Sequence, residues 1–133
     1  MKAEIHLTAT GLPSLLKRLP EYTDVILKAT DQALETGAWE IASEASQLAA
    51  TRMKIRTGKL WSSMEAKKIA PLIWSVGSPI SYAIWQERGF IHYISKKEVP
   101  GKYFLYDAFY NNMRRVKELI INYVDFSLTI RGV

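Results

Sequence analysis

Apolar and polar positions follow two periods along this chain, one typical of strands and one typical of helices. Residues 3–8 alternate, with Ile5 and Leu7 on one side, which predicts a short half-buried strand. From about residue 23 to about residue 50, apolar and small residues recur every three or four positions and predict a long helix. The same spacing predicts a second main helix over residues 103–124.

Shorter elements are predicted between and after these helices. In chain order they are a hairpin of strands at residues 63–70 and 73–77, a short helix at 82–87 closed by Gly89, a strand at 90–94, an exposed and mobile loop at 95–102 and a final strand at 125–132. The final segment alternates, with Phe126, Leu128 and Ile130 on one face. We therefore expect it to pair with the first strand and to bring the two ends of the chain together.

The order of these elements predicts a single α+β domain covering residues 1–133. The chain length is near the common domain size, and no internal repeat or interdomain linker divides it. We expect two main helices packed on a small, mostly antiparallel sheet, with flexible loops between the elements. The first helix presents alanine and glycine rather than leucine, so Gly37 is expected to let another element approach its backbone closely.

Charge is distributed unevenly along the chain. Residues 1–50 hold four basic and seven acidic residues, whereas residues 51–133 hold fourteen basic and six acidic residues. The densest basic stretch contains Arg52, Lys54, Arg56, Lys59, Lys67 and Lys68. It is either a surface near nucleic acid or an acidic partner, or a solvated loop and a polar strand face. Opposite charge in the two parts also favours head-to-tail contacts between subunits, which is how rings form.

The residues that carry chemistry are too scattered to predict an enzyme. His6 and His92 lie far apart, and the chain has no cysteine, so a structural zinc site is not expected. No serine lies in a nucleophile elbow, and Gly58-Lys59 lacks the rest of a phosphate-binding loop. We therefore expect no catalysis, no cofactor and no metal. The longest strongly apolar run, residues 119–121, is far shorter than a membrane span, so no membrane partner is expected.

Three short motifs follow one another in the middle of the chain. They are TGKLWSS at residues 57–63, YAIWQERG at residues 82–89 and FLYDA at residues 104–108. In the first motif, Gly58 suits a turn with positive φ, and Leu60 suits an anchor in the core. In the second, Glu87 has two interpretations. It bonds a backbone amide or an arginine within the fold, or it pairs with Arg56 or Arg88 of a neighbouring subunit.

The order and spacing of the three motifs resemble the tail-completion, or head–tail joining, protein family of long-tailed double-stranded DNA phages. Members typically carry a Thr-Gly-x-Leu-x-x-Ser turn, a Tyr-Ala-x-x-x-Glu-x-Gly segment and a Phe-Leu-x-x-Ala helix start. The matching residues of this chain are Thr57, Gly58, Leu60, Ser63, Tyr82, Ala83, Glu87, Gly89, Phe104, Leu105 and Ala108. The resemblance covers roughly residues 20–125. The chain departs from the family pattern around residues 90–99, where members often have a longer loop.

The resemblance implies a structural protein of the virion. Such proteins form a ring, usually a hexamer, that completes the tail and joins it to the head connector around the DNA channel. Assembly takes place in the host cytoplasm, and the implied partners are further copies of the chain, connector or adaptor proteins, and tail-terminator or tail-tube proteins. Residues then expected at subunit or partner contacts are Arg56, Thr57, Gly58, Tyr82, Trp85, Glu87 and Arg88. Residues then expected to face the DNA channel or the connector, without specific binding of DNA, are Arg52, Lys54, Lys59, Lys96 and Lys97.

The sequence leaves two alternative functions open. One is a ring that terminates growth of the tail tube, which would use a similar fold with a different neighbour. The other is a small basic nucleic-acid-binding protein. Against the second alternative, the aromatic residues lie at core-like spacings rather than among the basic residues.

Overall fold

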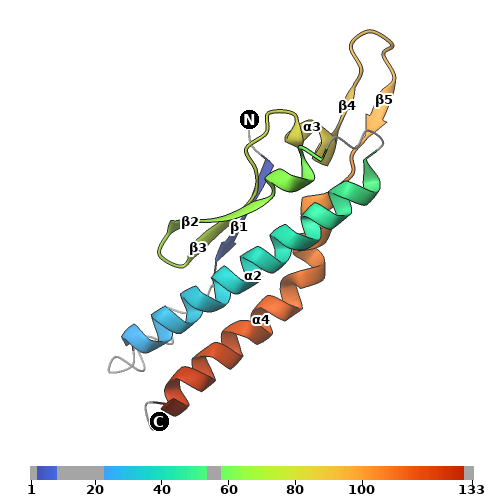
Figure 1. The fold of residues 1–133 in the computed structure, drawn as a ribbon. Coiled ribbons are helices and arrows are strands. Elements are labelled where there is room, and N and C mark those ends of the chain that lie inside the picture. The colour runs from blue at the N-terminus through green and yellow to red at the C-terminus, as the bar shows by residue number, and fades with distance from the viewer. Residues whose placement is uncertain (1–2, 9–22, 54–57, 131–133) are drawn as a thin grey trace.

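Two long helices and a three-stranded sheet make up most of the protein (Figure 1). The computed structural model describes residues 3–8, 23–53 and 58–130. In chain order the elements are β1 (Ala3–Thr8), α2 (Thr23–Arg52), the 3-10 turn η2 (Trp61–Ser63), β2 (Glu65–Ala70), β3 (Ile73–Ser78), α3 (Ala83–Arg88), β4 (Gly89–Ile91), β5 (Glu98–Pro100) and α4 (Phe104–Ile130). The predicted α+β class, with two main helices and a small antiparallel sheet, is confirmed.

The sheet is antiparallel, with β3 in the centre between β1 and β2. The predicted hairpin is confirmed as β2 and β3, although its first strand begins at Glu65 because Ser63 belongs to η2. Val76 pairs with Ile5 on one side and with Ala66 on the other, and this central residue is buried. The register fixes which face of each strand meets the helices, because neighbouring residues of a strand point to opposite faces.

Helix α2 lies between the sheet and α4 (Figure 1). Its buried residues are mainly alanine and other small residues, so α4 can approach it closely. A Cβ atom at Gly37 would lie 2.7 Å from a methyl group of Val116 in α4. The predicted close packing at Gly37 is therefore confirmed, and it explains a glycine that costs about 1 kcal/mol of helix propensity relative to alanine.

Polar contacts hold α2 in register with its neighbours. On the side that faces the sheet, the Asp31 carboxylate accepts hydrogen bonds from the Lys68 ammonium at 2.8 Å and from the Trp74 indole at 3.2 Å. Partial burial alone would raise the pKa of Asp31. The hydrogen bond and charge of Lys68, together with the bonds from Trp74 and the backbone of Leu72, outweigh this and lower the pKa below its usual value.

Protonation of Asp31 is expected to contribute to acid unfolding. Because its pKa is lower in the folded chain, the unfolded chain binds the proton first as the pH falls below about 4. The stability that Asp31 contributes is present above that pH and is lost as the pH falls through the folded pKa. In urea unfolding measured across this range, Asp31→Asn and Lys68→Met should each reduce the pH dependence. A dependence as steep as in the wild type would contradict this role.

The predicted strand at residues 125–132 is wrong over its described part, because α4 continues to Ile130. Six residues of alternating polarity fit a strand, but they also continue the stripe of the preceding helix. Val116, Ile120, Val124 and Leu128 recur at four-residue intervals and are all buried or half-buried, whereas Phe126 is exposed. No glycine or proline interrupts residues 125–130 to end the helix. The expected pairing with β1 is also wrong, since β1 pairs with β3.

The segment between α3 and α4 forms a two-stranded hairpin that we call the arm, residues 89–100. The predicted strand at residues 90–94 is shorter, ending at Ile91, and the predicted loop at residues 95–102 contains strand β5. In Figure 1 the arm projects beyond the C-terminal end of α2. Pairing of Phe90 with Val99 holds its two strands together.

Some of the predictions lie outside the described residues. They concern the expected interface residues Arg56 and Thr57 and the expected channel- or connector-facing residue Lys54.

Candidate interaction surfaces

Residues 58–63 of the first motif form a tight turn that is fastened to the sheet. Gly58 has a φ of +80°, which confirms the expected positive value, and Leu60 is buried as expected. The Ser63 hydroxyl lies 2.6 Å from the hydroxyl of Ser78 at the end of β3, and it donates to the Leu60 carbonyl. The geometry of the turn therefore has a structural cause within the subunit. Contacts of Gly58 with another subunit stay a prediction.

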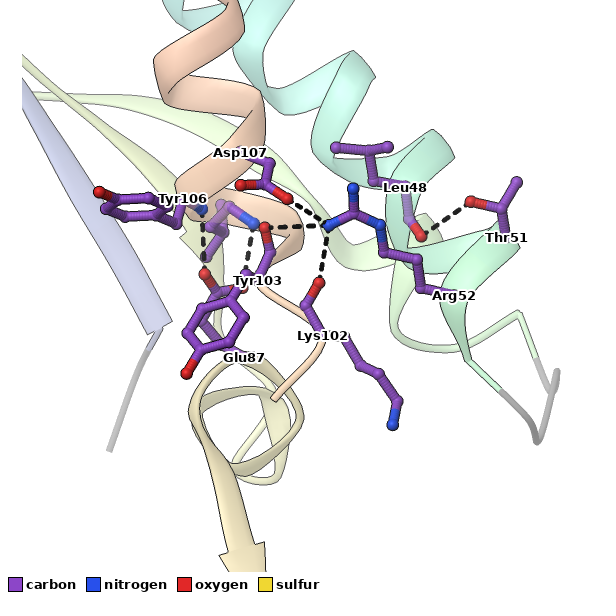
Figure 2. A network of polar contacts seen from close by, with 9 residues as sticks. Leu48, Thr51, Arg52, Glu87, Lys102, Tyr103, Tyr106 and Asp107 are labelled. Carbon is purple, nitrogen blue, oxygen red and sulfur yellow. Dashed lines mark hydrogen bonds and ion pairs between the residues drawn. The ribbon is translucent and has the colours of Figure 1, made fainter. Parts of the chain in front are cut away.

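Glu87 in α3 caps the start of α4 (Figure 2). Its carboxylate oxygens accept hydrogen bonds from the backbone N–H groups of Leu105 and Tyr106, each at 3.0 Å. These are amides of the first helical turn, which have no partner inside the helix, and Tyr103 before the helix offers no short capping side chain. The carboxylate also lies at the positive end of the helix dipole. Glu87, a residue of α3, therefore takes the role of the N-cap residue of α4.

The first interpretation of Glu87, a bond to backbone amides within the fold, is confirmed. The side chain is 7% exposed, and both of its oxygens bond α4. Pairing of Glu87 with a basic residue of a neighbouring subunit stays a prediction. Arg88, the adjacent residue, is exposed at the base of the arm.

Arg52 at the end of α2 also binds the segment in which the arm is followed by α4, which we call the junction (Figure 2). Its guanidinium donates to the carbonyl oxygen of Lys102 at 2.8 Å and to the carboxylate of Asp107 at 2.6 Å. The side chain is still 36% exposed, and its predicted place facing the DNA channel or the connector stays a prediction. The sequence did not reveal its structural role, because Arg52 and Asp107 are 55 positions apart in the chain.

The base of the arm is closely packed against this junction. The backbone N–H groups of Lys102 and Tyr103 donate to the carbonyls of Gln86 and Glu87. A Cβ atom at Gly101 would lie 2.6 Å from the Glu87 carbonyl oxygen. Both ends of the arm are therefore fixed to a rigid support, and the direction in which the arm projects is set by α3 and α4.

Large apolar side chains are exposed on the arm and beside it. Ile91, Tyr93 and Ile94 are 68%, 78% and 71% exposed, and Trp85 in α3 is 54% exposed. Trp85 and Ile91 line a shallow apolar hollow together with Tyr82, which is half-buried. Exposed apolar groups gathered in this way are typical of a surface that binds another protein.

A row of tyrosines follows the first turns of α4. The Tyr106 and Tyr110 rings lie with their centroids 4.9 Å apart, and Tyr103 meets the edge of Tyr106. The pKa of Tyr106 is raised, chiefly by its hydrogen bond with Tyr110. All three rings are about half exposed, so this row is a second surface with apolar character.

The described basic candidates lie on three separate elements. Arg52 ends α2, Lys59 is exposed in the turn before η2, and Lys96 and Lys97 are exposed at the tip of the arm. The four described candidates therefore come from separate parts of the fold. Whether these residues face DNA or a connector stays a prediction.

The described part of the chain holds no group of three or more His, Asp or Glu residues placed to bind a metal ion. None of its described helices is both long enough and apolar enough to cross a membrane. No protein-family model, curated protein or solved structure matches this chain.

Proposed function

We propose that this chain is a structural protein of a long-tailed phage that completes the tail and joins it to the head connector. In this role it forms a homo-oligomeric ring around the DNA channel and performs no catalysis. The support is the ordered set of three motifs, together with one structural observation. Glu87 of the second motif bonds the backbone of Leu105 and Tyr106 in the third, so two motifs that match the family separately act as one unit.

The exposed arm supports the assembly part of this proposal. A two-stranded hairpin alone is marginally stable in water, and this one exposes Ile91, Tyr93 and Ile94. Burial of these side chains against another protein would remove apolar surface from water and stabilise both the arm and the assembly. A rigid base at Glu87 and Arg52 would hold the arm in a fixed direction for that contact.

Deletion of the gene from the phage or prophage that encodes the chain tests the proposal. We expect filled heads and separate tails to accumulate, and a plasmid copy of the gene should restore joined particles. Mass spectrometry of restored particles should find several copies of the chain per tail. Joined, infectious particles formed without the gene would contradict the proposal.

The same deletion separates the alternatives. Tails of abnormal length would indicate a tail terminator instead. For a nucleic-acid-binding protein, the purified chain would bind duplex DNA at physiological ionic strength, with an affinity that falls steeply as salt increases. We expect a weak interaction under these conditions, because DNA that passes through a channel must not be held tightly.

A further inference from the structure

The tip of the arm combines apolar and basic side chains. Tyr93 and Ile94 are more than two thirds exposed, and Lys96 and Lys97 follow them. Within the described residues, neither lysine ammonium takes part in an ion pair or hydrogen bond. The tip therefore suits a partner surface that offers an apolar side chain beside an acidic one.

A surface of that kind lies on α2 of the same chain. Glu35 and Trp39 are one helical turn apart and both are exposed, with Trp39 49% exposed. Gly37 between them faces α4, so Glu35 and Trp39 lie on the outward side of α2. Helix α2 carries five acidic and two basic residues, which gives it a net charge opposite to that of the arm tip.

We propose that the arm of one copy docks on α2 of the next copy. Tyr93 and Ile94 would cover the Trp39 indole, while Lys96 and Lys97 lie near Glu35. A lysine ammonium over the indole would add a cation–π attraction. This contact deepens the proposed function, since it rests on the self-assembly that a ring requires.

The two surfaces lie on different parts of the subunit, as the single contact between neighbours in a ring requires. The arm projects past the C-terminal end of α2 (Figure 1). Glu35 and Trp39 lie near the middle of α2, which runs from Thr23 to Arg52, and are several turns away from its end. If each pair of copies shares one such contact, the interface is heterologous and closes into a ring when the rotation between copies allows. A symmetric pair would instead hold the contact twice, with the two arms exchanged. The edge strand β2 is a poor alternative, because its exposed Lys67 would repel the basic tip.

Site-directed cross-linking of the full chain tests this contact, because the protein has no native cysteine. Glu35→Cys and Lys97→Cys replace exposed residues and should leave the fold intact. A mixture of the two variants, treated with a short bifunctional thiol reagent, should give dimers joined through residues 35 and 97. The double variant should give a ladder of higher multimers. As a matched control, Lys117→Cys on the exposed side of α4 should not cross-link to Glu35→Cys.

Charge reversal provides a second, independent measurement. Glu35→Lys alone, and Lys96→Glu with Lys97→Glu, should each weaken self-association by about tenfold or more in analytical ultracentrifugation. Combining all three changes should restore association toward the wild-type value. Absence of the 35–97 cross-link, absence of this rescue, or a chain that stays monomeric at every concentration and on tails would overturn the proposed contact. Cross-linking of Lys97→Cys to His6→Cys on β1 would place the arm on the sheet edge instead and would also overturn it.

The outcomes separate this contact from the proposed function. If the chain forms rings on tails without the 35–97 cross-link, the docking of the arm is wrong and the head–tail joining role stands. If the cross-link and the rescue are found but deletion of the gene leaves joined particles, the contact stands and the phage role is wrong.

Discussion

Glu87→Gln is expected to lower the free energy of unfolding by about 2–4 kcal/mol. The carboxylate accepts two charge-assisted hydrogen bonds at the start of α4, and its side chain is buried. Glutamine keeps one acceptor oxygen, but its NH2 group would face a backbone N–H that donates and cannot accept. One amide of the first helical turn would then lie buried without a partner, and the favourable charge at the helix N-terminus would be lost.

Urea unfolding at neutral pH, followed by circular dichroism, measures this effect. Glu98→Gln on the exposed face of the arm removes the same charge without removing a cap, so its stability should stay within about 0.5 kcal/mol of the wild type. Glu87→Ala should cost at least as much as Glu87→Gln, since both hydrogen bonds are lost. Wild-type stability of Glu87→Gln, together with weakened self-association, would show instead that Glu87 acts mainly between subunits.

Gly89→Ala is expected to lower the free energy of unfolding by about 3 kcal/mol or more. Gly89 has φ 88° and ψ 169°, a conformation that is open essentially only to glycine and costs other residues about 1–3 kcal/mol. In addition, a Cβ atom there would lie 2.6 Å from the Val99 carbonyl oxygen and 2.7 Å from the Gly101 nitrogen. Because these are backbone atoms, the two strands at the base of the arm must separate to admit the methyl group.

Gly58→Ala is the matched control for this substitution. Gly58 also has a positive φ, +80°, but a Cβ atom there would come no closer than 3.4 Å to its nearest neighbour, on the Trp61 ring. Gly58→Ala should therefore lower the free energy of unfolding only through the cost of positive φ for a residue with a side chain, about 1–2 kcal/mol. Thermal unfolding of both variants measures the difference. Equal losses at the two positions would mean that crowding at the base of the arm contributes little.

Glu87→Gln and Gly89→Ala both alter the unit in which α3 meets the start of α4 and the base of the arm. Glu87 fixes the start of α4, and Gly89 begins the arm only two residues later. A variant that loosens this unit should also lose the fixed direction of the arm. The proposed contact between copies and the stability of the subunit are therefore linked through α3.

The two helices were predictable because their signal is local. An amphipathic helix repeats its apolar positions every three or four residues, and that repeat continues for most of α2 and α4. The same local reasoning failed at residues 125–130. A stretch of six residues contains too few periods to separate a strand from the end of a helix, and in the structure α4 continues through it to Ile130.

The candidate site was predictable only in part. The turn at Gly58 and the burial of Leu60 follow from residue chemistry. For Glu87 the sequence allowed two interpretations, and the bond within the fold was one of them. The sequence predicts the arm as a strand and a loop, because the pairing partner of β4 is a three-residue segment with a proline. Exposure of Tyr93 and Ile94 has no signature in sequence, where apolar residues are ordinarily expected to be buried.

The sequence by itself determined the class of the fold, the extent of the helices over most of their length and the order of the three motifs. Only the tertiary structure decided that Glu87 caps α4 and that Arg52 binds its first turn. The physical reason is distance along the chain. Glu87 and Leu105 are 18 positions apart, and Arg52 and Asp107 are 55 apart, so no local pattern records that these side chains meet.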